Sequence, residues 1–314
     1  MGILIALVPA VMWGLMGTIS MKLGGTAGQQ TLGTALGALV LGIGVNWLYV
    51  IPHRIVLTPA IWLTGLLSGI FWAIGISGQY LAFKDLGVSV GLPLSIAGQI
   101  VTNALMAAAV LGEWTTGKMW LVGTLAVSAI VLGAILTSAR KRYTLPHAAQ
   151  KKISPTFRHG LLVLALSTVG FMFYFVFPNL MVKIGAVSAQ TFHANGGITY
   201  MTAVVLPQAC GQILGALFLM TVVFRETRLI IGRRSLTNIL TGLCWAVGNL
   251  CMLLSAANPN VGQTTATALS QMCVLVGTYS GIFILHEAKS RSQMHKIAIG
   301  TLLMVTGGFL IATI

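Results

Sequence analysis

The sequence has very few acidic residues. Only four of its 314 residues are Asp or Glu, and charged residues of both signs make up 7% of the chain. A soluble domain of this size could not cover its surface with so few charges. The sequence offers no paired carboxylates and no nucleophile–base pair, so we expect no catalytic residues, no enzyme activity and no cofactor.

Cysteine is also scarce, with four residues in the whole chain. They show no metal-ligand spacing, and all fall within or near apolar runs. We therefore interpret them as small packing residues and expect no metal site. These residues are Cys210, Cys244, Cys251 and Cys273.

Hydrophobic residues, in contrast, make up 56% of the chain, and the mean hydropathy is +0.92. Apolar stretches of about 20 residues recur, which is the length that crosses a bilayer core as a helix. They are continuously apolar rather than alternating, which favours helices over a barrel. We predict an all-α membrane protein with ten transmembrane helices, at about residues 2–21, 31–50, 60–82, 88–111, 118–138, 160–181, 191–223, 236–256, 263–285 and 295–314.

The basic residues are distributed unevenly over the connections between these spans. Fifteen of the 18 Lys and Arg residues fall in odd-numbered connections, and only Arg54, Lys118 and Lys183 fall in even-numbered ones. The positive-inside rule places the odd-numbered connections in the cytoplasm. We therefore expect a multi-pass protein of the cytoplasmic membrane with both termini outside. We interpret the net charge of +14 as a result of this topology. We therefore expect membrane lipid as a partner and no nucleic acid.

The sequence also contains an internal repeat. Two residue pairs, each 173 positions apart, carry it: Trp72 with Trp245, and Gly75 with Gly248. Each half holds five spans, an odd number, so the second copy enters the membrane from the opposite side. We predict inverted five-helix repeats at 1–138 and 160–314, joined by a basic cytoplasmic linker at 139–159. Inverted repeats are typical of secondary transporters, whose site lies near the membrane midplane between the halves.

Uncharged polar side chains recur at helical spacing inside several spans. In GLCWAVGNL (242–250), Trp245 and Asn249 are four apart and share a helix face, and Ser95, Gln99 and Asn103 form a similar stripe. Amides can pair with the hydroxyl groups of a neutral polyol, and indoles can cover the apolar face of a sugar ring. Interhelical hydrogen bonding is the alternative role. The candidate substrate-binding residues are Trp13, Trp72, Gln79, Gln99, Asn103, His193, Trp245, Asn249 and Gln271.

Three titratable residues are candidates for carrying a coupling proton. His193 is the only histidine well inside a predicted span, and an imidazole exchanges protons near neutral pH. Glu113 and Glu287 close the fourth and ninth spans, where a structural role at a helix end is the alternative. Asp85 and Glu226 lie in basic connections, and we expect them to be solvated.

Short motifs along the whole chain resemble the bacterial glucose/ribose uptake porter family of the drug/metabolite transporter superfamily. They are ALVPAVMWG (6–14), TLGTALGALVLG (31–42), SGIFWAIG (68–75), LGEW (111–114), GLCWAVGNL (242–250), ALSQ (268–271) and GIFILHEAK (281–289). The resemblance implies a ten-helix sugar carrier, driven by a proton gradient. The positions that match the family's site are Trp72, Gln99, Trp245, Asn249, Ser270 and Gln271. Residues 76–78 (Ile-Ser-Gly) and His286 depart from the family pattern.

Three functions therefore compete. The first is a secondary carrier that takes up a monosaccharide of the glucose or ribose type by alternating access. The second is an exporter of a hydrophobic drug or metabolite, which the 14 methionines keep open. The third is a membrane sugar receptor that never moves its ligand.

Overall fold

A computed structural model describes residues 2–106, 108, 114–137, 155–257, 269–270, 272–311 and 313. Over these ranges the chain forms helices and turns and no strand, as the apolar runs predict. Glu113, Gln271 and most of the predicted linker 139–159 lie outside the described residues.

The helices follow the order of the predicted spans. Those before the linker are α1 (Gly2–Leu23), α2 (Ala27–Val45) with the π-helical turn η1 (Asn46–Val50), α3 (Pro59–Leu86), α4 (Val88–Met106) and α5 (Gly117–Thr137). Those after it are α6 (Pro155–Lys183), α7 (Ala189–His193), η3 (Ala194–Gly197), α8 (Ile198–Phe218), η4 (Leu219–Val223), η5 (Thr227–Leu229), α9 (Arg233–Thr237), α10 (Ile239–Ala257), α12 (Cys273–Phe283) and α13 (Arg291–Ile311).

Seven helical segments in the described part are long and apolar enough to cross a membrane: Leu4–Leu23, Ala27–Val50, Pro59–Leu86, Gly117–Thr137, Pro155–Pro178, Ala189–Val223 and Arg233–Met252. The helices α4 and α12 are apolar but shorter, and the neighbouring residues 109–113 and 258–268 lie outside the described part. The first turns of α13 carry Arg291 and Lys296, which lower its hydropathy. The count of ten spans therefore stays a prediction.

Apolar side chains cover much of the outer surface, and polar side chains lie inside. On α5, Leu121 and Leu125 are exposed, whereas Thr34 of α2 and Thr64 of α3 are fully buried. This distribution is what lipid demands, because apolar surface is stable against acyl chains and polar groups must find partners within the protein.

Two helix crossings depend on glycine. On α2 and α10, Gly37 and Gly242 face each other so closely that a Cβ atom at either position would meet the other helix's backbone. The same relation holds between Gly69 of α3 and Gly211 of α8. Small residues at such crossings let helix backbones approach within a membrane. Gly69 and Gly242 are 173 positions apart, and Gly37 and Gly211 are 174 apart, so the two crossings match the spacing of the sequence repeat.

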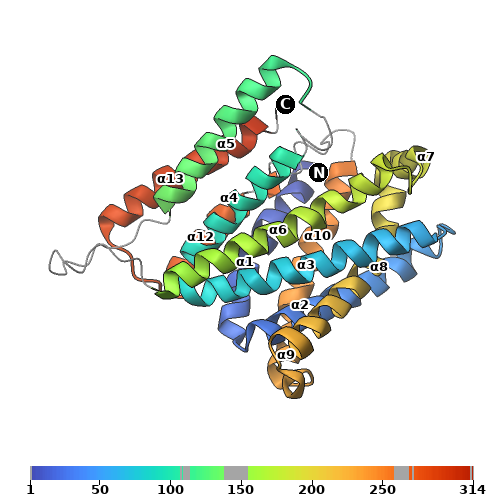
Figure 1. Ribbon diagram of the computed structural model, residues 1–314, viewed down its shortest axis with the longest axis horizontal. Coiled ribbons are helices and arrows are strands. Elements are labelled where there is room, and N and C mark those ends of the chain that lie inside the picture. The colour runs from blue at the N-terminus through green and yellow to red at the C-terminus, as the bar shows by residue number, and fades with distance from the viewer. Residues whose placement is uncertain are drawn as a thin grey trace.

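The helices form one bundle in which contacts come in matched pairs. In the first half α3 packs on α6 and α8, and in the second half α10 packs on α1 and α2. Similarly, α4 packs on α6, and α12 packs on α1. The pair α5 and α13 lies along one edge of the bundle (Figure 1). Exchange of the two halves thus reproduces these three pairs of contacts.

Four of the odd-numbered connections (the first, third, seventh and ninth) meet at one end of the bundle, which we name the basic end (residues 23–26, 84–89, 225–238 and 286–289). Lys84 Nζ donates to Gly25 O at 2.8 Å, and Asn238 Nδ2 donates to Gly24 O at 3.0 Å. Arg234 donates to Leu23 O. The basic end therefore joins the first connection to the third and seventh.

Candidate functional site

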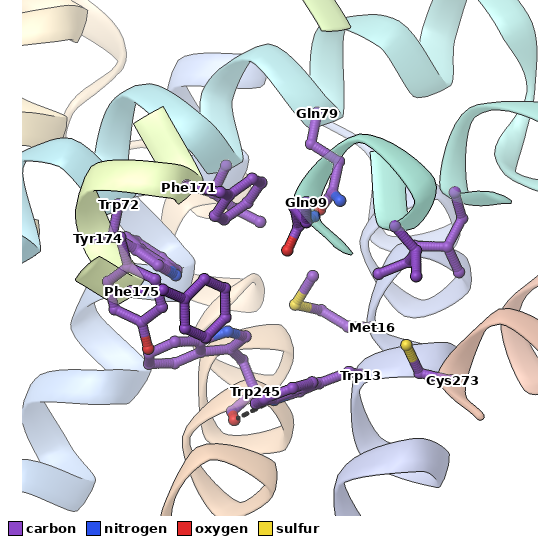
Figure 2. Close-up of a pocket in the computed structure, with 13 residues that line it drawn as sticks. Trp13, Met16, Trp72, Gln79, Gln99, Phe171, Tyr174, Phe175, Trp245 and Cys273 are labelled. Carbon is purple, nitrogen blue, oxygen red and sulfur yellow. Dashed lines mark hydrogen bonds between the residues drawn. The ribbon is translucent and has the colours of Figure 1, made fainter. Parts of the chain in front are cut away.

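A small cavity lies between α1, α3, α4, α6, α10 and α12. Figure 2 shows aromatic rings, two amides and a methionine around it. Its lining residues are Trp13, Met16, Trp72, Ile76, Gln79, Leu92, Ile96, Gln99, Phe171, Tyr174, Phe175, Trp245 and Cys273.

Indole rings form one wall of this cavity. The rings of Trp72 and Trp245 lie 4.8 Å apart between centroids, at an interplanar angle of 54°. Trp13 Nε1 donates to the Trp245 carbonyl oxygen at 3.1 Å, which fixes the third indole beside them. Trp72 is fully buried, and its Nε1–H has no hydrogen-bond partner. The two tryptophans related by the repeat therefore meet at the centre of the protein.

Glycines make room for two of the aromatic rings. The Trp13 ring covers Gly248 of α10, and the Phe171 ring covers Gly75 of α3, so that a Cβ at either glycine would collide with the ring. These are the two glycines that the sequence repeat aligns. A small residue at both positions thus explains why the Trp-x-x-Gly pattern occurs twice.

Two amides and a hydroxyl form a second wall. Gln79 Nε2 of α3 donates to Ser95 Oγ of α4 at 2.7 Å, and Gln99 Nε2 donates to the same oxygen at 3.1 Å. Gln79 Oε1 is buried without a partner. In Figure 2 the oxygen of Gln99 points into the cavity. The arrangement leaves amide oxygens available as acceptors for hydroxyl groups.

Asn249 does not line this cavity. It lies 7% exposed in a second, smaller cavity between α2, α8 and α10. Trp245 lines both cavities. Tyr174 of the first cavity donates its hydroxyl to Asn249 Oδ1 at 3.0 Å, which links the two. Trp245 and Asn249 thus share a cavity, as expected, but it is the second cavity, because Asn249 does not reach the central one.

Three other predicted residues lie outside both cavities. The Asn103 Oδ1 atom is buried without a partner, one helical turn beyond Gln99. Ser270 is buried elsewhere, at 1% exposure. His193 is exposed at the end of the short helix α7, so its placement well inside a span is wrong. The chain leaves the helix after His193 because Asn195 and the glycines at 196–197 adopt positive φ angles, which a continuous α-helix excludes.

The described carboxylates all have partners, and Glu287 bridges the two halves at the basic end. Glu287 accepts the backbone N–H of Val88 at 2.7 Å, and it also accepts hydrogen bonds from the N–H and hydroxyl of Ser89. This geometry places a negative charge at the N-terminus of α4, where the helix dipole stabilises it. The structural role that the sequence left open for Glu287 thus has a clear basis.

The other two carboxylates are paired rather than merely solvated. Thr26 Oγ1 donates to Glu226 Oε2 at 2.5 Å, and His159 Nδ1 lies 2.7 Å from Asp85 Oδ2. Both residues are partly exposed as well as paired. The first contact joins the two halves, and the second joins α3 to the first turns of α6.

Sequence reasoning missed most of the apolar lining. Phe171, Tyr174 and Phe175 of α6 face the cavity. Their helix segment, FMFYFVF (171–177), is so rich in aromatic residues that no single position stands out. Gln208 and Gln212 of α8 were also missed, although their spacing of four follows the same rule as Gln99 and Asn103.

Comparison with known proteins places this arrangement in a family. Residues 4–314 match the family described as "Sugar transport protein". The chain belongs to this family. It is 39% identical over 308 residues to the "Putative sugar uptake protein" of Lactiplantibacillus plantarum, which covers 98% of this chain and 97% of that one. It is 36% identical over 306 residues to the "Glucose uptake protein GlcU" of Bacillus subtilis, covering 97% and 96% of the two chains.

Membership in this family shows the general class of the protein. The family belongs to the drug/metabolite type of membrane transporters, and the seven long apolar helices agree with a multi-pass membrane protein. A solved crystal structure has the same fold, with a TM-score of 0.58 at 16% sequence identity; the match covers 98% of this chain and 95% of that one. At this identity the likeness concerns the fold alone.

Proposed function

We propose that this protein is a secondary carrier that takes up a monosaccharide of the glucose or ribose type by alternating access. The observation that carries the proposal is the central cavity, where indoles and amides from both halves meet without a charged side chain among the lining residues. A neutral polyol matches this lining, because amides pair with its hydroxyls and indoles cover its C–H faces. The relatives named as sugar and glucose uptake proteins support the same substrate class.

The architecture supports movement of the bound sugar. We propose two five-helix repeats, 1–138 and 160–314, in opposite orientations, with both termini outside. The matched contacts of α3 and α10, and the two glycine crossings at repeat-related positions, favour this arrangement. Rocking of one repeat against the other would then open the cavity to each side in turn.

Counterflow in liposomes tests the proposal. Purified protein should exchange labelled glucose or ribose against an excess of the unlabelled sugar on the other side. Binding without exchange would favour a receptor, and a hydrophobic compound that displaces sugar would favour the export function. No exchange with any monosaccharide would reject the proposal.

We further propose that protons drive the uptake, as a separate claim. Of the candidates, Glu113 lies outside the described residues, and His193 and Glu287 both lie outside the two cavities, but Glu287 alone of these two is hydrogen-bonded across the halves. It joins α12 to α4 across the halves, where a change of charge would alter the closure of the basic end. An imposed pH gradient should drive sugar accumulation in liposomes, and the Glu287→Gln variant should retain counterflow but lose that accumulation. Facilitated diffusion would instead give wild-type counterflow with no accumulation.

A further inference from the structure

The second cavity holds a polar side chain that has no partner. Gln212 of α8 is 1% exposed, and neither its Nε2 nor its Oε1 atom makes a hydrogen bond. A buried primary amide normally satisfies both groups, since each one left unpaired carries a desolvation penalty. A buried amide with neither group paired indicates that a polar group of a ligand binds it.

Other amides surround Gln212. Gln208, one turn earlier on α8, and Asn249 of α10 line the same cavity. Gln208 Nε2 donates to Ser68 Oγ at 2.9 Å, and Ser68 Oγ donates to Tyr174 O at 3.0 Å. These bonds hold Gln208 in place, and the hydroxyl of Tyr174 holds Asn249. Three amides from two helices therefore converge on one small space, of which Gln212 alone is wholly unpaired.

The position of this cavity relates it to the sugar site. Trp245 lines both cavities, and Tyr174 of the first is hydrogen-bonded to Asn249 of the second. A shift of the Trp245 ring would therefore join the two spaces. The joined space would present Gln99 and Gln79 on one side and the three amides on the other.

We propose that Gln212, Gln208 and Asn249 form a second hydroxyl-binding subsite of the carrier, and that Gln212 helps to set which sugar it accepts. This inference rests on the proposed sugar transport. A hydroxyl group suits Gln212 because it can donate to Oε1 and accept from Nε2. A sugar that lacks this hydroxyl leaves the amide unpaired, which is the usual basis of strong discrimination.

The test compares Gln212→Met with Gln30→Met in liposome counterflow. Methionine is close to glutamine in size but lacks its donor and its carbonyl acceptor. Gln30 is the matched control, because it is equally buried, lies outside both cavities and donates to Ser20 O at 3.0 Å. Competition by each monodeoxy analogue of the best-exchanged sugar reports which hydroxyl each variant recognises.

In the Gln212→Met variant, competition by the parent sugar should weaken about tenfold, the loss expected for one hydrogen bond. The variant should bind one deoxy analogue with the same affinity as the parent sugar. Gln30→Met should keep the wild-type ranking of analogues. The sugar-free melting temperature of Gln212→Met should equal or exceed that of the wild type, since an unpaired amide has been removed. Gln212→Asn, which withdraws the amide by one methylene, should show the same selective loss.

The opposite pattern would overturn the inference. An unchanged analogue ranking together with a lower melting temperature would show that Gln212 binds ordered water as a structural group. Failure of both Gln212 variants to fold would lead to the same conclusion. Wild-type protein without counterflow would reject the proposed function itself, whereas wild-type counterflow with an unselective Gln212→Met variant would reject only the subsite.

Discussion

The centre of the protein and its basic end use polar side chains in opposite ways. At the basic end two carboxylates have a partner in the other half, Glu226 in Thr26 and Glu287 in the α4 backbone. In the centre, Trp72, Gln79 and Gln212 each keep a buried polar atom without a partner. Satisfied groups stabilise a closed arrangement, whereas unsatisfied buried groups lower stability unless something binds them.

We therefore assign contact between the two halves to the basic end, and sugar recognition to the centre. The paired groups of the basic end hold the two halves together. Trp72 and Gln79 line the central cavity and Gln212 lines the second one, whereas other unpaired groups such as Gln30 Oε1 lie outside both. Substitutions in the centre should therefore change sugar affinity with little effect on folding, and substitutions at the basic end should do the reverse.

The largest effect is expected for Trp245→Ala. Its ring packs on Trp72 and lines both cavities, so truncation removes the surface that would cover a sugar ring. We expect sugar affinity to fall about 30-fold or more, as for a buried aromatic residue at the centre of a binding site. Counterflow at a series of sugar concentrations measures this loss. Trp47→Ala, at an exposed position on η1, is the control and should leave the affinity unchanged.

A smaller effect is expected for Gln99→Leu. The change removes an amide that lines the first cavity and donates to Ser95. Sugar affinity should fall about tenfold, while the sugar-free melting temperature changes little, because leucine fills a similar volume. An unchanged affinity would assign Gln99 to helix packing and weaken the contrast between centre and end.

Glu287→Gln should act mainly on stability. The variant keeps the shape of the side chain but loses the charge that accepts the N–H groups of Val88 and Ser89. We expect the free energy of unfolding to fall by about 1–2 kcal/mol, the scale of hydrogen bonds to a charged group. Thermal unfolding in detergent measures this, and sugar affinity from counterflow should stay within about twofold of wild type. A large loss of affinity with unchanged stability would reverse the roles assigned to the two regions.

The smallest effect is expected for Asp85→Asn. Its partner His159 has a side chain that is 62% exposed, so solvent screens the pair. Such exposed pairs contribute about 0–1 kcal/mol. The variant should show near wild-type melting and counterflow, which makes it the reference for the Glu287 variant. A marked loss of either property would show that the basic end depends on this pair as well.

The sequence predicted the bundle better than it predicted the site. Helical runs and the repeat of Trp72 and Trp245 follow from spacing, which a sequence states directly. In the structure these two indoles meet at the centre of the protein.

The directions of individual side chains limited how well the sequence predicted the site. Trp245 and Asn249 share a helix face and both line the second cavity, but only Trp245 also reaches the central one. Tyr174 could not be chosen from its aromatic-rich helix by spacing. In contrast, the error on His193 was avoidable, because Asn195 and the two glycines after it are residues that tolerate positive φ and end a helix.

The central claim is that a sugar binds between the paired indoles of the two halves. Tryptophan fluorescence measures this directly, because Trp72 and Trp245 line the cavity while Trp47 lies exposed outside it. Addition of glucose or ribose should give a saturable fluorescence change in the wild type and in Trp47→Phe, and none in the Trp13→Phe/Trp72→Phe/Trp245→Phe triple variant, which removes all three indoles of the cavity. A saturable change that persists in the triple variant would contradict the account.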